Sequence, residues 1–303
     1  MRKRKQFTPS LIRRLRDEGR GTGVHLDFTP LHRVRRSEPA SSGTSAIVPP
    51  RGQFSTGQQL SLAEQIAYEF CSMVEHLDDL RLQVRLEIDR HLNCLHDYSQ
   101  RDDEQTYPGT NDICHALGIR RPALRQGADV EDWIHSTDLV LTTKAPFEGR
   151  RLLAVSVKDD ALCKLSKRKR QLLSVERDYW LSQGHNWLLI TPETYCPRVG
   201  EAIMRSAGFV HGHEPLDDAH LERTADLVKR VERSLIGHLY HLMDDFRCSM
   251  SQAQTLFWQA VWNSRILVDW RHTLWASNAV RLVSKHEFQA FNPVISGRSA
   301  WPS

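Results

Sequence analysis

The sequence predicts a mixed α/β domain built around a central sheet, followed by a second domain that is mainly α-helical. Residues 60–191 show helix and strand patterns in the order helix, strand, strand, strand, helix, strand, which is typical of a sheet flanked by helices. Residues 198–285 show mostly helical periodicity, with a possible winged segment near residues 265–275. The 303 residues are enough for two domains, and length alone also allows one large domain.

The first 58 residues are interpreted as a basic arm. They are rich in Arg, Gly, Ser and Pro and show little apolar periodicity. One short helix is expected over residues 8–17, with Pro9 near its first turn and Gly19 beyond its end. Residues 37–57 are expected to be irregular. The predicted limits are therefore 1–58 for the arm, 59–195 for the α/β catalytic domain and 196–303 for the helical domain.

The α/β domain begins with an amphipathic helix, predicted over residues 60–77 from two neighbouring apolar stripes. Strict alternation of apolar residues over 79–90 predicts a half-buried strand, and the polar stretch 91–130 is left unassigned. Residues 138–144 and 151–158 are predicted strands, joined by a hairpin turn around Pro146 and Gly149. A helix over 160–183, ended by Gly184, leads to a short buried strand over 186–191.

The charge of the chain is unevenly distributed. Residues 1–36 carry eleven Lys or Arg against three acids, a charge of +8, so a net charge of +4 leaves −4 for the rest. A second basic run covers residues 164–170. Such clusters are typical of contacts with a phosphate backbone, although a solvated tail and an exposed helix face would look the same. The predicted DNA-binding residues are Arg13, Arg14, Arg16, Arg20, Lys164, Lys167, Arg168, Lys169 and Arg170.

The cysteines and the hydropathy indicate the compartment. The six cysteines are widely scattered without a CxxC pair, which favours reduced thiols in a cytosol-like compartment over a disulfide framework. No apolar run approaches the roughly 20 residues that a membrane span needs. We therefore expect a cytoplasmic protein without membrane contact.

Three ionisable residues are the strongest functional signal. Glu64 lies near the start of the first predicted helix, Asp138 opens the hairpin, and Lys158 closes it. Carboxylates bind Mg²⁺ through oxygen ligands, and a lysine can polarise water or stabilise the pentavalent phosphate of phosphodiester cleavage. Two carboxylates about 4 Å apart repel by about 4 kcal/mol at an effective dielectric constant of 20. A divalent cation would remove that penalty, so Mg²⁺ is expected, with Mn²⁺ as a possible substitute.

Each of these residues also has a purely structural interpretation, and the pattern alone leaves the choice open. Ser61 and Glu64 have the spacing of a capping box. Asp138 could be a residue of strand entry, and Lys158 could be an exposed charge at the end of a strand. Side-chain alternation along this strand would place Ser156 and Lys158 on a polar face.

Short stretches within residues 10–195 resemble one known family. Leu60-Ser-Leu-Ala-Glu64 is similar to the segment that carries the catalytic glutamate of TnsA, the endonuclease subunit of heteromeric cut-and-paste transposases. Ser136-Thr-Asp138 is similar to its aspartate motif, and Leu153-Ala-Val-Ser-Val-Lys158 to its lysine strand. Segments 13–23, 41–43, 77–83, 118–122, 176–180 and 187–191 are similar to further motifs in the same order. The wider class is the restriction-endonuclease-like nucleases with a PD-(D/E)xK core.

The resemblance implies roles for individual residues. Glu64 and Asp138 would bind the metal together with the backbone carbonyl of Val157, and Lys158 would be the catalytic lysine. Ser156 is a departure, because the family usually carries Gln there and the wider class Glu or Asp. Ser156 is therefore expected to support the metal ligands by hydrogen bonding, together with Glu176.

The resemblance also implies a function. The chain would cut the 5′ ends of a mobile element beside the DDE-type transposase TnsB and under the AAA+ ATPase regulator TnsC, and would associate with the nucleoid of a bacterium. The C-terminal domain would contact these partners. The alternatives are a stand-alone restriction- or repair-type nuclease and a catalytically silent scaffold that only binds DNA.

Overall fold

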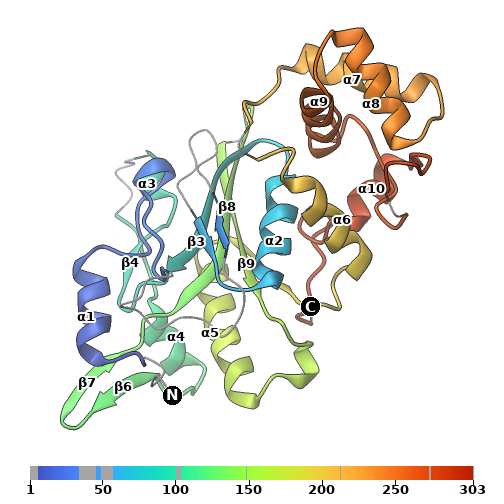
Figure 1. Cartoon of the computed structure of the whole chain (residues 1–303). Coiled ribbons are helices and arrows are strands. Elements are labelled where there is room, and N and C mark those ends of the chain that lie inside the picture. Colours follow the sequence, from blue (N-terminus) through green and yellow to red (C-terminus); the bar gives the residue numbers. More distant parts are fainter. Residues whose placement is uncertain are drawn as a thin grey trace. The chain divides into compact units, whose positions relative to one another are not determined.

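The chain divides into two compact units in a computed structural model that describes residues 6–33, 46–48, 57–99, 104–147, 149–211, 213–272 and 274–302. The first unit comprises Met1–Gln65, His76–Thr191 and Ser299–Ser303, and the second comprises Ile66–Glu75 and Pro192–Arg298 (Figure 1). The second unit thus includes a segment far from the rest of it in sequence. The predicted functional residues all lie in the first unit.

The centre of the first unit is a four-stranded mixed sheet with the order β10-β9-β8-β3. Strands β3 (Leu77–Arg85), β8 (Ser136–Ala145) and β9 (Gly149–Val157) are antiparallel neighbours, and β10 (Asn186–Ile190) runs parallel to β9. The predicted hairpin is confirmed, and its turn is closed by Gly149 at φ 76°, a conformation that glycine adopts without strain. This arrangement matches the predicted mixed α/β class.

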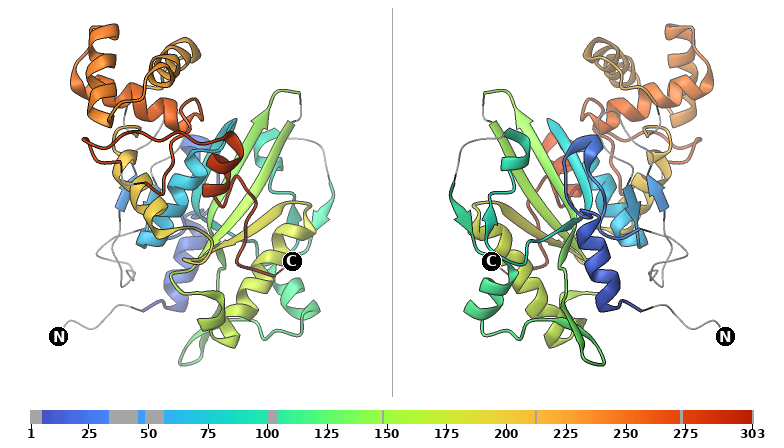
Figure 2. Two further views of the ribbon diagram at one scale, coloured as in Figure 1. Left: turned by 90° about the vertical axis from the view of Figure 1, so that its right-hand side faces the viewer. Right: turned by 90° about the vertical axis from the view of Figure 1, so that its left-hand side faces the viewer.

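Helix α5 (Lys167–Ser182) connects the parallel strands β9 and β10. It begins later than the predicted residue 160 because Ser166 caps it by accepting a hydrogen bond from the N–H of Lys169. The short 3-10 helix η2 (Leu162–Lys164) precedes it. Tyr179 and Trp180 of α5 are buried in one core with Val140, Ala154 and Leu189 of the sheet, and the helix can be followed beside the strands in Figure 2.

Part of the predicted basic arm is folded. Helix α1 (Pro9–Asp17) confirms the short helix expected there, with Thr8 as its N-cap. Its buried residues Ile12 and Leu15 pack with Leu31 and Ile134, and a 3-10 helix, η1 (His25–Asp27), follows. Most of the linker expected over 37–57 lies outside the described residues, apart from β1 (Ala46–Val48), which pairs with β2 (Gly57–Gln59).

Two predicted boundaries around the first helix were wrong. Helix α2 (Leu62–Ser72) is shorter than the predicted 60–77, and β3 begins at Leu77 rather than at residue 79. The chain turns at His76, whose φ of 57° stops a helix from continuing. The first turn of α2 belongs to the first unit and its later turns belong to the second.

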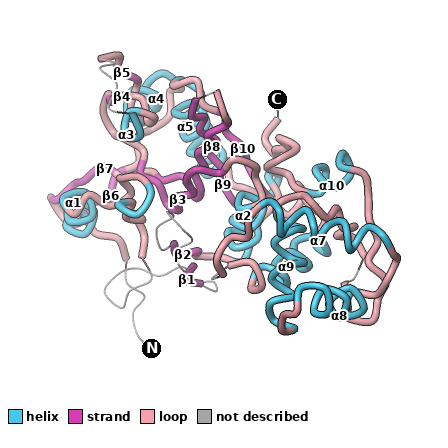
Figure 3. The backbone as a smooth tube through the Cα atoms, turned by 90° about the horizontal axis from the view of Figure 1, so that it is seen from above, coloured by secondary structure: helices cyan, strands magenta, loops and turns pink. Residues whose placement is uncertain are grey.

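The described residues of the unassigned stretch 91–130 form only short elements, which explains its weak sequence pattern. Their bounds are β4 (His91–Leu92), α3 (His96–Ser99), β5 (Thr106–Tyr107), α4 (Thr110–Ala116), β6 (Ala123–Gln126) and β7 (Asp129–Asp132). Strands β4 and β5 form one pair and β6 and β7 another, outside the central sheet (Figure 3). Helix α1 packs against the pair β6–β7.

The second unit is mainly α-helical, as predicted. Its helices are α6 (Pro197–Ala207), α7 (Asp218–Arg230), α8 (Leu235–Phe246), α9 (Met250–Trp262) and α10 (Lys285–Phe291), together with the later turns of α2. The described residues of the predicted winged segment near 265–275 form turns and one isolated bridge, Val268 to Leu282, and no hairpin. None of the described helices of the chain has the length and apolar character needed to cross a bilayer.

Candidate active site

Asp138 lies where the hairpin strands stop pairing. The backbone register of β8 and β9 ends at Leu139 opposite Val155. One step further, Asp138 Oδ2 accepts the N–H of Val157 at 2.7 Å, so a carboxylate replaces a backbone carbonyl in the ladder. Strand β9 keeps its other neighbour, because the N–H of Lys158 donates to Ile190 O at 3.0 Å. This local departure from sheet geometry holds the Asp138 carboxylate at the end of the strands.

Lys158 is bound to the same carboxylate. Its Nζ donates to Asp138 Oδ2 at 3.0 Å and to the backbone carbonyl of Val157 at 2.6 Å, while 31% of its side chain remains exposed. Burial alone would lower the pKa of Lys158, but the carboxylates of Asp138 and Glu176 outweigh burial and leave the pKa raised. Lys158 therefore contributes a fixed positive charge at neutral pH.

Glu64 both caps the start of α2 and lies at the predicted active site. Its N–H donates to Ser61 Oγ at 3.2 Å, and its Oε2 accepts the N–H of Leu60 at 2.9 Å, so it ties down the start of α2. Burial, followed by repulsion from Asp138, raises the pKa of Glu64 to about 8. Asp138 is close enough to raise this pKa, and a helix cap alone would not need such a neighbour.

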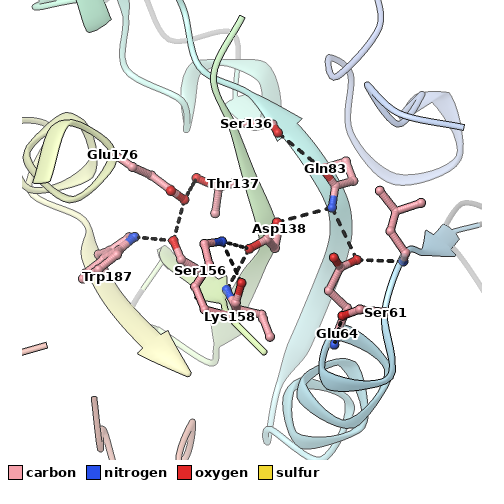
Figure 4. A network of polar contacts seen from close by, with 12 residues as sticks. Ser61, Glu64, Gln83, Ser136, Thr137, Asp138, Ser156, Lys158, Glu176 and Trp187 are labelled. Atoms are coloured by element: carbon pink, nitrogen blue, oxygen red, sulfur yellow. Dashed lines mark hydrogen bonds and ion pairs between the residues drawn. The ribbon is translucent and has the colours of Figure 1, made fainter. Parts of the chain in front are cut away.

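Gln83 is the residue that sequence reasoning missed. Its Nε2 lies 3.4 Å from Glu64 Oε2 and 3.4 Å from Asp138 Oδ1, so one amide joins the two carboxylates (Figure 4). The only sequence signal is a polar residue between Leu82 and Val84, at one of the polar positions of an alternating strand, and surface-facing strand positions look the same.

The three predicted catalytic side chains line a solvent-accessible cavity of about 230 Å³. Glu64 comes from a helix, Asp138 from one strand and Lys158 from the end of the next, as the sequence predicted they would. Lys169 of the second basic run also lines the cavity. The complete lining is Ser61, Glu64, Asp138, Val157, Lys158, Asp159, Asp160, Leu165 and Lys169.

Behind this cavity, Glu176 is enclosed in a hydrogen-bonded cluster. Its Oε1 accepts the hydroxyls of Thr137 at 2.6 Å and Ser156 at 2.5 Å. Each hydroxyl oxygen in turn accepts an indole N–H, that of Thr137 from Trp180 at 2.8 Å and that of Ser156 from Trp187 at 2.9 Å. Figure 4 shows Glu176 with Thr137, Ser156 and Trp187. Burial raises the pKa of Glu176 to about 7, although the positive charge of Lys158 opposes the shift.

The predicted polar face of strand β9 is wrong in one respect. Ser156 is completely buried, as are its neighbours Val155 and Val157 on the other face. A hydroxyl can be buried when its hydrogen bonds are satisfied, and Glu176 and Trp187 satisfy Ser156. Both predicted supporting residues, Ser156 and Glu176, therefore contact each other.

The three arginines of α1, and Arg20 beyond its end, contact acids of their own unit, and Arg20 is buried. Arg13 binds Asp129 at 2.7 Å and Glu131 at 3.1 Å. The other pairs are Arg16 with Glu131 at 2.8 Å, Arg14 with Glu18 at 3.6 Å and Arg20 with Glu18 at 3.0 Å. The structure does not bring these four arginines into the cavity, and their contact with DNA stays a prediction.

The second basic run is placed differently. Lys164, Lys167, Lys169 and Arg170 are exposed at the start of α5, and Arg168 donates to the backbone carbonyl of Arg120 at 2.7 Å. The start of a helix carries unpaired backbone N–H groups and a positive dipole end, which add to the attraction for phosphate. Of the predicted DNA-binding residues, Lys169 is the one that lies at the cavity.

The donor set of the cavity fits a hard divalent cation. In the described part of the chain, no group of three or more His, Cys, Asp or Glu is arranged to hold a metal ion. The cavity nevertheless offers oxygen donors of the kind that Mg²⁺ prefers, from the carboxylates of Glu64 and Asp138 and the carbonyl of Val157. Burial and the neighbouring Asp138 both raise the pKa of Glu64, and a bound cation would favour its ionised form.

Comparison with known proteins does not assign the chain to a family. No model of a known protein family matches the sequence, and no match to a curated protein was found either.

Proposed function

We propose that this chain is a divalent-cation-dependent DNA endonuclease. The observation that carries the proposal is the meeting of Glu64, Asp138 and Lys158 in one solvent-accessible cavity, although they are separated by 74 and 20 residues in sequence (64 to 138, 138 to 158). A chance set of surface charges has no reason to place two carboxylates on one buried amide beside a lysine. The exposed basic side chains at the start of α5 favour a polyanionic substrate over a small neutral one.

Each residue of the cavity has a distinct role in the proposed cleavage. Glu64, Asp138 and the Val157 carbonyl would hold Mg²⁺ or Mn²⁺. The cation, when bound, supplies Lewis-acid activation of water and of the scissile phosphate. Lys158, fixed by Asp138, presents a positive charge to the phosphate as negative charge develops on its oxygens. Lys169 holds the neighbouring phosphate backbone at the cavity.

The resemblance to TnsA refines the proposal. The chain would cut the 5′ ends of a mobile element, with a DDE-type transposase cutting the opposite strands and an AAA+ ATPase regulating the complex. Because free nicking would damage the host chromosome, cleavage would depend on these partners. A catalytically silent DNA-binding scaffold is the second candidate, and the complete burial of Ser156 favours it, since this position cannot supply a ligand from its side chain.

The test is strand cleavage by the reconstituted subunits on DNA that carries the element ends, with Mg²⁺ and with EDTA. Asp138→Ala and Lys158→Ala should each abolish nicking at the 5′ ends while the partner's cuts persist. Lys144→Ala is the matched control, because Lys144 is an exposed lysine at the other end of the same hairpin. Variants that nick as well as the wild type would refute the site, and a wild type without cleavage under all these conditions would favour the scaffold.

A further inference from the structure

Gln83 lies at the contact between the two carboxylates, and its position is built into the sheet. Leu82 pairs with Leu139 and Val84 pairs with Thr137, so Gln83 stands opposite Asp138 in the β3–β8 ladder. Its side chain is 2% exposed. Its Nε2 is equidistant, at 3.4 Å, from one oxygen of Glu64 and one oxygen of Asp138 (Figure 4).

The backbone at Gln83 is held in an unfavourable conformation. Among the described non-glycine residues, Gln83 alone has a positive φ, 58°, inside a strand. Its carbonyl leaves the ladder and accepts the N–H of Leu31 at 3.1 Å. A residue with a Cβ atom persists in this conformation only where the surroundings impose it, and such outliers cluster at functional sites. The strain therefore marks the placement of this amide as a feature with a function.

The amide of Gln83 has two chemically different ends, and both have suitable partners. The donor end, Nε2, faces the carboxylates. The acceptor end, Oε1, lies 3.4 Å from Ser136 Oγ. A hydroxyl can donate or accept, so Ser136 can stay bonded to either end of the amide after a half turn of the amide group. The same side chain can thus offer a donor to two bare carboxylates or an oxygen to a cation between them.

We propose that Gln83 is a third side-chain oxygen ligand of the divalent-cation site and turns its Oε1 toward the cation when the cation binds. The inference rests on the proposed function, since it requires that cation. A neutral amide adds an oxygen donor without adding a third negative charge. It supplies from β3 the ligand that Ser156, turned toward Glu176, does not provide from β9.

The experiment is calorimetric titration of the full-length chain with Mn²⁺, without DNA and without any measurement of cleavage. Gln83→Leu removes both ends of the amide at similar volume. Gln83→Gly also removes the amide but suits the positive φ, so it tests the inference even if the Leu variant folds poorly. Gln259→Leu is the matched control, a buried glutamine of the second unit that bonds the backbone at Glu214 and Leu216.

We expect Gln83→Leu and Gln83→Gly to bind Mn²⁺ about 10-fold or more weakly than the wild type, with Gln259→Leu unchanged. The direction of the change in Mn²⁺ affinity distinguishes an amide that binds the cation from an amide that only donates to the carboxylates. If Gln83 acts only as a donor to the carboxylates, its amide competes with the cation, and both variants will bind Mn²⁺ equally or more tightly. That outcome overturns this inference and leaves the proposed function intact. A wild type that does not bind Mn²⁺ at all removes both.

Discussion

Two groups of polar side chains lie at the ends of β8 and β9. Both contain a carboxylate, but one group is enclosed and the other lines a cavity. On one side, which we call the sealed side, Glu176 is enclosed by Thr137, Ser156, Trp180 and Trp187. On the other, the open side, Glu64 and Asp138 share Gln83, and Asp138 also binds Lys158, at a cavity of about 230 Å³. Both sides bury a carboxylate whose pKa is raised, Glu176 to about 7 and Glu64 to about 8.

The comparison shows that burial of a carboxylate does not by itself mark a reactive site. The hydroxyls that bind Glu176 are 2.5 and 2.6 Å away, and each is oriented by an indole N–H. The two carboxylates on the open side share one amide at 3.4 Å, a much weaker contact. Glu64 and Asp138 also accept shorter bonds from Leu60, Val157 and Lys158, so the two sides differ mainly in their access to solvent. A polar cluster that is enclosed contributes to stability, whereas a carboxylate pair that lines an open cavity can be reached by a ligand.

The largest expected effect is on cleavage from the open side. Asp138→Asn keeps the shape of the side chain and an oxygen that can accept the N–H of Val157. It removes the negative charge, so nicking should fall by about 10³-fold, which corresponds to about 4 kcal/mol of transition-state stabilisation. Single-turnover nicking by the reconstituted complex measures this. Thermal unfolding of the same variant should stay close to the wild type, and a folded variant with normal nicking would contradict the assignment.

The next effect is on stability and should come from the sealed side. Glu176→Ala leaves the buried hydroxyls of Thr137 and Ser156 without their acceptor, which should lower the free energy of unfolding by about 2–4 kcal/mol. Glu64→Ala on the open side loses a helix-start contact worth about 1 kcal/mol and is relieved of repulsion from Asp138. Urea unfolding at pH 7 compares the two. Equal losses would remove the distinction between the sides.

The sealed side also predicts a dependence of stability on pH. The unfolded chain releases the proton of a glutamate near pH 4.3, whereas Glu176 in the fold keeps it until about pH 7. The folded state therefore binds the extra proton between these values, and Glu176 makes the protein less stable as pH rises through this window. Below about pH 4.3 its contribution is fully present. Glu64, whose pKa is raised to about 8, adds a slope of the same sign, so Glu176→Gln should make this part of the stability profile shallower without removing the slope. A Glu176→Gln variant with the wild-type slope would show that Glu176 does not contribute to it.

Much of the fold was predictable from the sequence. The elements that were missed or misplaced depend on short segments and on helix caps that leave no periodic pattern. Apolar patterns identified the hairpin, α5 and β10, because each buries a continuous stripe, whereas α1 was predicted from the Pro and Gly at its two ends. The stretch 91–130 failed because its elements are two to seven residues long, too short for a periodic pattern. The start of α5 was misplaced because the cap at Ser166, and not the apolar pattern, decides where it begins.

The site was predictable in its charged members and not in its neutral ones. Glu64, Asp138 and Lys158 were predicted from their order along the helix and the hairpin and from the resemblance of the short segments that carry them, because each residue alone also has a structural interpretation. Gln83 could not be found in this way, since its role depends on a backbone conformation and a cross-strand position that arise only in the folded sheet. Likewise, no sequence pattern pairs Ser156 with Glu176, which lies 20 residues later on a different element.

A smaller effect is expected from the strain at Gln83. Gln83→Gly relieves the positive φ and should raise the free energy of unfolding by about 1 kcal/mol, less the loss of weak contacts made by the amide. Gain of stability together with loss of Mn²⁺ affinity would be the signature of a strained functional residue. Denaturant unfolding of the two proteins at one pH gives the result, and a destabilised Gly variant would show that the amide is needed mainly for folding.

The smallest effect concerns the basic side chains around the open side. Lys169→Gln should reduce the slope of log affinity against log salt by about 0.9, because one phosphate contact is lost from duplex DNA. Arg13→Gln should change this slope less, since Arg13 already binds Asp129 and Glu131. DNA binding between low and moderate salt measures both variants. A larger change for Arg13 than for Lys169 would move the DNA contact away from the cavity and toward α1.

The most direct measurement is the position of Mn²⁺ in crystals of the full-length chain, located by its anomalous scattering. The account predicts one strong peak in the cavity, with oxygens of Glu64 and Asp138 about 2.0–2.3 Å from it and the amide oxygen of Gln83 turned toward it. A Mn²⁺ ion bound elsewhere, or a cavity without a peak at millimolar Mn²⁺, would contradict the claim that these carboxylates form a cation site.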